Sequence, residues 1–170
     1  MKKLLCIISC IILVGCSSSS DHSISPVLTL NIVGGNMQNP DFLGHATSVA
    51  VQVYQLSETG EFDSADVYSF FGGDETPALS SNSFDSSARY IVSPRQTESE
   101  EISLAPGVTS IGVVVMFRNI NESVWKLTAP VSSNGTTEIT LYINRLKASI
   151  TSDSDDKDRR KSKQGIFSFL

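Results

Sequence analysis

Residues 110–119 read SIGVVVMFRN, a nearly continuous apolar run that is rich in β-branched residues. β-branched side chains fit the pleated surface of a strand, and an apolar run of this length is typical of a strand in the interior of a β protein. Pro106-Gly107 supplies a turn signal just before it. This stretch therefore predicts the central, buried strand of a β-sandwich.

The segments on either side show the alternation of shorter strands. In residues 27–33, the apolar residues Leu28, Leu30 and Ile32 alternate with polar ones, as on a half-buried strand. Further strands are predicted at residues 48–56, 89–93, 100–104, 124–128 and 138–143. About seven or eight strands with turn signals between them predict a mainly β fold, an antiparallel β-sandwich that occupies residues 27–151.

One short helix is predicted after the second strand. Asp63 can cap the free N–H groups at the start of a helix, and Phe70 and Phe71 would lie on one apolar face. Gly72-Gly73 would end the helix. The expected helix covers about residues 63–71.

The N-terminal segment is organised like a bacterial export signal. Lys2 and Lys3 precede an apolar run over residues 4–14. This run is too short to span a bilayer as a helix, which takes roughly 20 apolar residues. It ends in Leu13-Val14-Gly15-Cys16-Ser17, which resembles a lipobox, where a peptidase cuts before the cysteine and the thiol is acylated. The alternative is an ordinary cleaved signal with an incidental cysteine.

The lipobox resemblance predicts the organisation of the N-terminus, and the charge pattern predicts that of the C-terminus. Residues 1–15 are expected to be a cleaved signal peptide, and Cys16 to carry several acyl chains such as palmitate, which would anchor the domain because one chain alone binds membranes only marginally. By resemblance to bacterial lipoproteins, Ser17 permits export to the outer membrane. Residues 16–26 read as a serine-rich, flexible tether. Residues 152–170 are expected to be a charged, disordered tail.

The composition excludes several classes of function. The chain has 13 basic and 18 acidic residues and a net charge of −5, which argues against nucleic-acid binding because that binding neutralises phosphates with cations. Cys6 and Cys10 lie in the signal, so Cys16 is the one cysteine left. An acylated thiol leaves no disulfide, no cysteine nucleophile and no cysteine metal ligand.

Candidate catalytic and metal groups are sparse. His45 is the one histidine beyond the tether, and the chain has no Gly-x-Ser-x-Gly elbow, so a hydrolase with His45 as general base is only a third option. Asp153, Asp155, Asp156 and Asp158 lack the glycine and the closing glutamate of a calcium loop. We therefore expect no enzyme activity, no small-molecule substrate, no metal and no cofactor other than a covalent lipid.

Residues 34–46 form a loop that is longer than a hairpin needs. Glycine, asparagine and proline mark it as irregular, yet it also carries Met37, Phe42 and Leu43. Apolar residues of this kind occur at the centres of protein interfaces. Two alternatives stay open: these side chains contact a partner, or they fold back onto the sandwich.

Aromatic residues offer a second kind of binding surface. Trp125, Tyr54 and Tyr90 could stack against sugar rings, so a lipoprotein module that binds glycan or peptidoglycan is the alternative function. A single tryptophan on a strand more often packs against the core than it presents a ligand platform.

A set of short motifs is more specific in its order and spacing than any one motif alone. The motifs are Val53-Tyr54-Gln55-Leu56, Phe62, Ala65-Asp66-Val67, Asn39-Pro40 with Gly44, Leu104-Ala105-Pro106-Gly107, and Val113 to Asn119 followed by Trp125. Together they resemble the TssJ (SciN-type) lipoproteins of the bacterial type VI secretion system, over residues 27–143 and the lipobox. Two features depart from the family pattern: Val67 replaces a usual aromatic, and the charged tail has no counterpart.

The resemblance implies a transthyretin-like β-sandwich on the periplasmic face of the outer membrane, held by the lipid on Cys16. It implies an adaptor without chemistry, which binds the periplasmic C-terminal domain of TssM within a complex with TssL. In the family the loop between the first two strands binds the partner, and residues 34–46 correspond to it. The expected contact residues are Asn36, Met37, Gln38, Asn39, Pro40, Asp41, Phe42 and Leu43.

Overall fold

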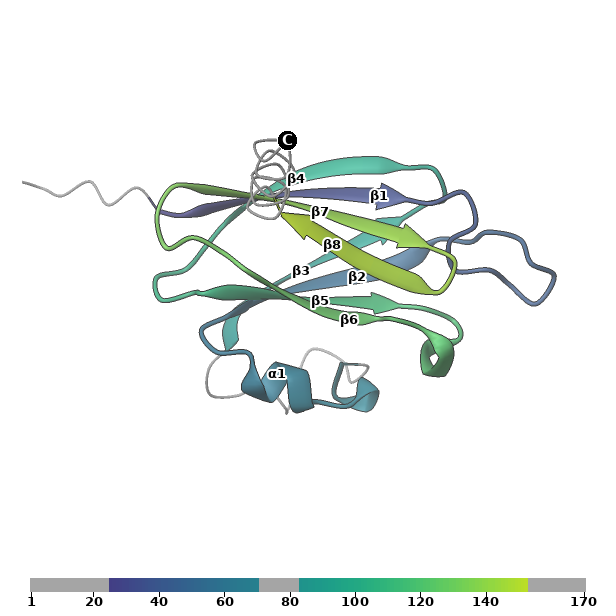
Figure 1. The fold of residues 1–170 in the computed structure, drawn as a ribbon, viewed down its shortest axis with the longest axis horizontal. Coiled ribbons are helices and arrows are strands. Elements are labelled where there is room, and N and C mark those ends of the chain that lie inside the picture. Colours follow the sequence, from purple (N-terminus) through teal and green to yellow (C-terminus); the bar gives the residue numbers. More distant parts are fainter. Residues whose placement is uncertain (1–24, 71–82, 153–170) are drawn as a thin grey trace, which may run out of the picture.

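The computed structural model describes residues 25–70 and 83–152, which form eight strands arranged as two facing sheets (Figure 1). The strands are β1 Val27–Gly34, β2 Val49–Leu56, β3 Ser83–Val92, β4 Thr97–Ser103, β5 Ser110–Met116, β6 Lys126–Pro130, β7 Thr136–Asn144 and β8 Lys147–Ser152. The helical segments are α1 Gly60–Ser64, η2 Val67–Phe70 and η4 Ile120–Glu122. The predicted mainly β sandwich with a short helix is confirmed.

The first sheet has the strand order β4-β1-β7-β8, and the second has β3-β2-β5-β6. Neighbouring strands are antiparallel except β1 and β7, which run parallel from Val27↔Thr136 to Gly34↔Ile143. The alternation of apolar residues fixes which face of a strand is buried, but it does not fix the direction of the neighbouring strand. The parallel pair is therefore a departure from the all-antiparallel expectation.

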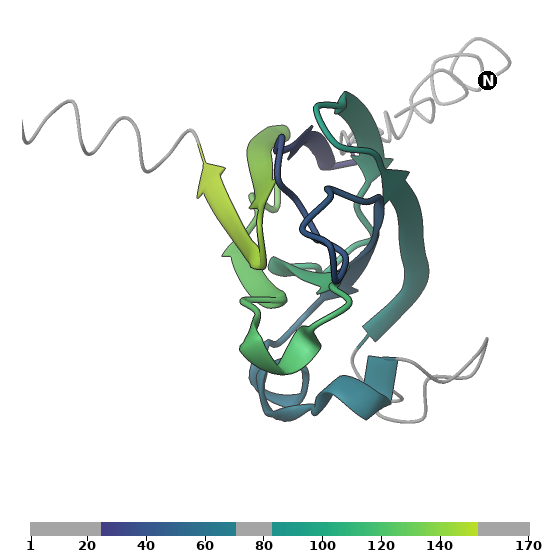
Figure 2. The same ribbon diagram turned by 90° about the vertical axis from the view of Figure 1, so that its right-hand side faces the viewer.

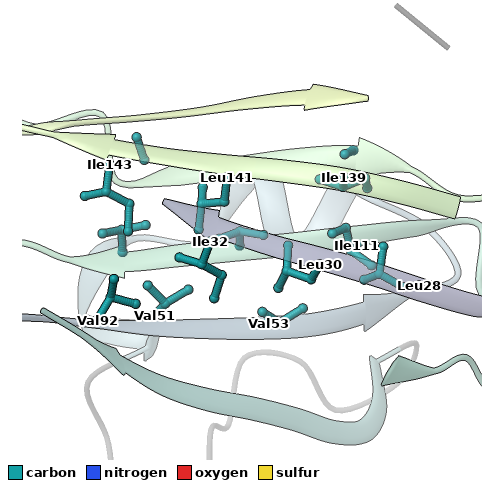
Figure 3. Close-up of a cluster of buried hydrophobic side chains, with 14 of the residues drawn as sticks. Leu28, Leu30, Ile32, Val51, Val53, Val92, Ile111, Ile139, Leu141 and Ile143 are labelled. Carbon is teal, nitrogen blue, oxygen red and sulfur yellow. The ribbon is translucent and has the colours of Figure 1, made fainter. Parts of the chain in front are cut away.

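The main core lies between the two sheets (Figure 3). Alternate residues of β1, β7, β2 and β5 point into it and are almost completely buried, as their period of two requires. The labelled members are Leu28, Leu30, Ile32, Val51, Val53, Val92, Ile111, Ile139, Leu141 and Ile143. Each fully buried side chain of this size contributes roughly 1.5–3 kcal/mol to the hydrophobic driving force.

The central strand β5 is covered on both faces, which explains its continuous apolar run. Val113 points into the main core, while the neighbouring Val114 points out of the sandwich into a second cluster. That cluster contains Tyr54, Phe62 and Phe70, supplied by β2, α1 and η2, and Figure 1 shows the helical segment lying beneath the second sheet. The prediction of a central buried strand is confirmed.

The short helix lies a few residues earlier than predicted. Asp63, expected to cap it, lies inside α1, and the position before the helix is Thr59, whose side chain makes no capping hydrogen bond. The chain then turns and forms the separate 3₁₀ segment η2. Burial of Phe62 and Phe70 against the sheet determines this geometry, so tertiary packing outweighs the local capping signal. Phe71 lies outside the described residues.

Strand β8 was not predicted. Its sequence KASITS has only two apolar residues, Ala148 and Ile150, and it pairs with β7 alone in the first sheet. The predicted signal peptide, Cys16, Ser17 and residues 153–170 of the predicted tail lie outside the described residues, whereas Ser152 belongs to β8. Within residues 25–70 and 83–152, no helix is both long and apolar enough to cross a membrane.

Candidate protein-binding loop

The loop between β1 and β2 lies at one end of the sandwich, which Figure 2 shows facing the viewer. Two polar residues are buried at its base: Gln38 is 0% exposed and Asn39 is 3% exposed. The Gln38 amide Nε2 donates hydrogen bonds to the carbonyl oxygens of Val92 at 2.8 Å and Thr47 at 3.3 Å. These bonds attach the loop base to β3 and to the segment that leads into β2.

Asn39 connects the loop to two further parts of the chain. Its Oδ1 accepts from the backbone N–H of Arg118 at 2.8 Å, and its own N–H donates to the carbonyl of Arg145 at 2.8 Å. Its Nδ2 donates to the carbonyl of Ser48 at 2.8 Å. The backbone has φ 44°, a left-handed conformation that asparagine tolerates better than most residues. Buried hydrogen bonds of this kind contribute about 1 kcal/mol each.

The exit from β1 depends on two glycines. A Cβ on Gly34 would lie 2.5 Å from the Ser93 carbonyl oxygen, and one on Gly35 would lie 2.6 Å from the Ile143 carbonyl oxygen. Contacts this short exclude any side chain at either position without movement of the backbone. The loop therefore leaves the sheet close against β7 and the turn that joins β3 to β4.

The tip of the loop is ordered by Asp41. Its Oδ1 accepts from the backbone N–H groups of Leu43 at 2.9 Å and His45 at 2.8 Å, and its Oδ2 lies 3.4 Å from His45 Nδ1. The hydrogen bond from the His45 backbone is the main reason that the pKa of Asp41 lies below its ordinary value. A further bond joins the Asp41 N–H to the His45 carbonyl at 2.9 Å. The tip is thus a closed turn with its own hydrogen-bond network.

This ordered tip presents apolar side chains to solvent. Phe42 is 92% exposed, Leu43 is 66% exposed and Met37 is 38% exposed. In the structure, Phe42 and Leu43 do not fold back onto the sandwich, so the second of the two alternatives does not apply to them. Adjacent exposed apolar side chains on a rigid support are typical of interaction sites.

The predicted contact residues divide into two groups. Asn36, Met37, Phe42 and Leu43 are exposed, and Pro40 and Asp41 are partly exposed. Gln38 and Asn39 are buried and hold the loop in place. Burial of these two residues could not be predicted from the sequence, because glutamine and asparagine in a loop are usually solvated. Their partners in other segments, including Thr47 and Arg118, were also not predicted.

The aromatic residues of the alternative function do not share one surface. Tyr54 is 6% exposed and packs against Phe62 and Phe70 on the outer face of the second sheet. The half-buried Trp125 ring contacts Phe70 at a centroid distance of 5.7 Å. Tyr90 packs instead against the core between the sheets. These rings stabilise the fold from different sides of the second sheet.

His45 contributes to loop structure through its backbone and ring contacts with Asp41. Within residues 25–70 and 83–152, no group of three or more histidine, cysteine or acidic side chains is placed to hold a metal ion. The arrangement that the structure does supply is a rigid two-sheet frame and an ordered apolar loop tip. Fold and loop together define a two-sheet β-sandwich with an exposed apolar loop tip at one end.

Comparison with known families agrees with this class. Residues 26–146 match the T6SS-SciN family of type VI secretion lipoproteins, whose description names VasD, EvfM and TssJ. The chain belongs to this family of type VI secretion lipoproteins, as its motifs indicated. The family consists of structural lipoproteins and is not a known family of enzymes. No curated protein sequence matches the chain.

Solved structures share the fold. TssJ1, a type VI secretion lipoprotein from Pseudomonas aeruginosa, superimposes with a TM-score of 0.70 at 16% identity, over 75% of this chain and 96% of TssJ1. Serratia marcescens Lip, a membrane-bound component of the type VI secretion system, gives a TM-score of 0.62 at 18% identity, over 74% of this chain and 95% of Lip. A chain in the structure described as the TssM C-terminal domain (869–1107) from EAEC gives a TM-score of 0.61 at 21% identity. The superposition covers 74% of the present chain and 97% of that chain.

Proposed function

We propose that this chain is the lipid-anchored adaptor of a type VI secretion membrane complex, fixed through Cys16 to the periplasmic face of the outer membrane. Its loop tip binds the periplasmic C-terminal domain of TssM, within a complex that also contains TssL. Family membership supports the secretion role. A chain with this fold also occurs in a structure of a TssM C-terminal domain, which supports TssM as the partner.

The observation that carries the proposal is the exposure of Phe42, which is 92%, on a loop whose base and tip are both hydrogen bonded. A large apolar side chain held in water contributes nothing to the stability of the isolated domain, but it gains roughly 1.5–3 kcal/mol when a partner buries it. The ordered backbone also lowers the entropy cost of association. Phe42 therefore has the properties of a central interface residue.

The first prediction is that Phe42→Asp weakens binding to the TssM periplasmic domain at least tenfold without lowering the melting temperature. A carboxylate at this position would be desolvated in an apolar pocket, whereas in the free protein it stays in water. Isothermal titration calorimetry gives the affinity and differential scanning calorimetry the melting temperature.

Tyr68→Asp is the matched control, because Tyr68 is an aromatic residue that is 82% exposed on η2, away from the loop. It should leave both the affinity and the melting temperature unchanged. Equal loss of affinity in the two variants would contradict the assignment to the loop. A large loss of stability in Phe42→Asp would show that Phe42 supports the fold.

A further inference from the structure

Three arginines surround the base of the loop. The backbone N–H of Arg95 donates to the Gly34 carbonyl at 3.0 Å, and that of Arg118 donates to Asn39 Oδ1 at 2.8 Å. The Arg145 carbonyl accepts from the Asn39 N–H at 2.8 Å. They come from the β3–β4 turn, the segment after β5 and the β7–β8 turn, and all three residues are exposed. Segments far apart in the sequence thus bring three cations to the end of the molecule that carries Phe42.

Two of these arginines adopt a backbone conformation that does not suit them. Arg95 has φ 64° and Arg145 has φ 52°, and among the described residues Asn39 is the other non-glycine with positive φ. Glycine or asparagine is favoured at such turn positions because a long side chain with a Cβ is crowded there. Local conformational preference therefore does not account for arginine at either turn, and strain of this kind is found where a side chain serves a function.

The described part of the chain also gives these arginines no acidic partner. No ion pair joins any of them to a carboxylate within residues 25–70 and 83–152. Among the carboxylates near this end, Asp41 accepts from loop amides and Glu98 accepts from Gln96. Lys147 adds a further exposed cation beside the β7–β8 turn. Exposed cations are thus gathered around the loop of a chain whose net charge is −5.

We propose that Arg95, Arg118 and Arg145 form a cationic rim that selects a partner surface with carboxylates around an apolar pocket. The inference rests on the proposed function, and it specifies the chemistry of the partner: an acidic protein surface on the TssM domain. Guanidinium groups pair with carboxylates through two parallel hydrogen bonds. Charges at the rim of an interface act mainly on the association rate and its salt dependence, while the buried apolar centre sets the dissociation rate.

Arginine-to-asparagine variants of the full lipoprotein, purified in detergent, test the rim. Asparagine removes the charge and tolerates positive φ, so Arg95→Asn and Arg145→Asn should melt at the same temperature as the parent or higher. The association rate constant with the purified TssM periplasmic domain should fall about twofold to fivefold for each variant, and about tenfold or more for the triple variant. Stopped-flow kinetics between low and high salt should show a shallower salt dependence in the triple variant.

Arg89→Gln is the charge-matched control, since Arg89 is exposed on β3 away from the loop. It should leave the association rate unchanged. If the triple variant associates with TssM at the parent rate while Phe42→Asp still binds TssM weakly, the cationic rim is contradicted and the proposed function is not. Failure of the parent protein to bind the TssM domain would overturn both.

Two other results would also overturn the rim. A fall in melting temperature for Arg95→Asn and Arg145→Asn would mean that the arginines support the fold. A triple variant that loses binding to phosphatidylglycerol vesicles but keeps its TssM kinetics would mean that the rim binds an anionic lipid surface instead.

Discussion

Gly112 on β5 determines how closely the helical segment approaches the second sheet. A Cβ at this position would lie 2.5 Å from the ring of Phe62, which is fully buried. Phe62 in turn packs against Tyr54 and Phe70 at centroid distances of 5.8 and 5.4 Å. Glycine inside a strand lowers intrinsic strand stability, and here it provides the space that an aromatic ring occupies.

We expect Gly112→Ala to lower the free energy of unfolding by about 1–3 kcal/mol, because the added methyl group forces the Phe62 ring to move. Urea denaturation gives this value from the shift in midpoint. Gly60→Ala is the control, since a Cβ on Gly60 meets nothing within 4 Å, and it should have little effect. Equal effects of the two substitutions would contradict the packing of Phe62 against β5.

The structural role of Gln55 could not be predicted from the sequence. The motif Val53-Tyr54-Gln55-Leu56 contributes to the family resemblance, but a glutamine on a strand gives no sign that its side chain is buried. In the structure Gln55 is 2% exposed and joins the two sheets: its Nε2 donates to the Ser103 carbonyl at 3.1 Å, and its Oε1 accepts from the Ala105 N–H at 2.8 Å. Apolar burial was predictable from periodicity, whereas a buried polar bridge depends on which strands face each other.

The loop between β1 and β2 is organised in two parts that perform different tasks. Gln38 and Asn39 attach its base to neighbouring segments, and Asp41 closes its tip. In the proposed function, this hydrogen-bonded backbone holds Phe42 and Leu43 in one arrangement before TssM binds. Pre-organisation of this kind raises affinity by lowering the entropy lost on binding.

We expect Asp41→Ala to loosen the tip and to weaken TssM binding about threefold to tenfold, because the loop loses part of its pre-organisation. Hydrogen exchange at the Leu43 and His45 amides should become faster, while the melting temperature changes little. Asp41→Asn keeps an oxygen acceptor for both amides and should preserve most of the slow exchange. Unchanged exchange in Asp41→Ala would contradict the role of this carboxylate.

The pH dependence of the tip follows from the direction of the Asp41 pKa shift. The pKa is lowered from 3.8 in the folded protein, chiefly by the His45 backbone hydrogen bond. The ionised carboxylate therefore supports the folded loop above pH 3.8, and this support is lost as the pH falls through the lowered pKa. Exchange at these two amides should consequently be insensitive to pH changes near neutrality, after correction for the intrinsic exchange rate.

Most strands were predictable because one face of each is apolar, and the failures have physical reasons. The continuous run of β5 indicated a buried centre, and both of its faces are indeed covered. Strand β8 was missed because it has few apolar residues and derives its conformation from pairing with β7. The start of α1 was misplaced because packing of Phe62 outweighs the capping preference of Asp63.

In the proposed function, the two ends of the molecule have different tasks: one is anchored and the other binds TssM. Strand β1 begins at Val27, where the N-terminal segment joins the fold, and it ends at Gly34, where the loop begins. The strand has eight residues, and the seven steps between its ends separate these points by about 23 Å. In the proposed function, residues 17–26 add up to about 35 Å of reach from the membrane when extended. The anchor and the binding loop would then lie at opposite ends of a rigid sandwich.

We expect Cys16→Ser to release the protein from membranes and to abolish secretion, because the acyl chains would supply its attachment. The fold should be unchanged, since every described strand lies between Val27 and Ser152. Cell fractionation gives the location, and circular dichroism of the purified variant gives the fold. A Cys16→Ser protein that stays on the membrane and supports secretion would contradict lipid anchoring.

The central claim is that this sandwich holds one partner by the tip of one loop. Site-specific photo-crosslinking in secreting cells tests it most directly, with a photoreactive amino acid placed at Phe42 and, for comparison, at the exposed Tyr68 on η2. We expect an adduct with TssM from position 42 and none from position 68. An adduct with TssM from position 68 but not from position 42 would contradict the claim.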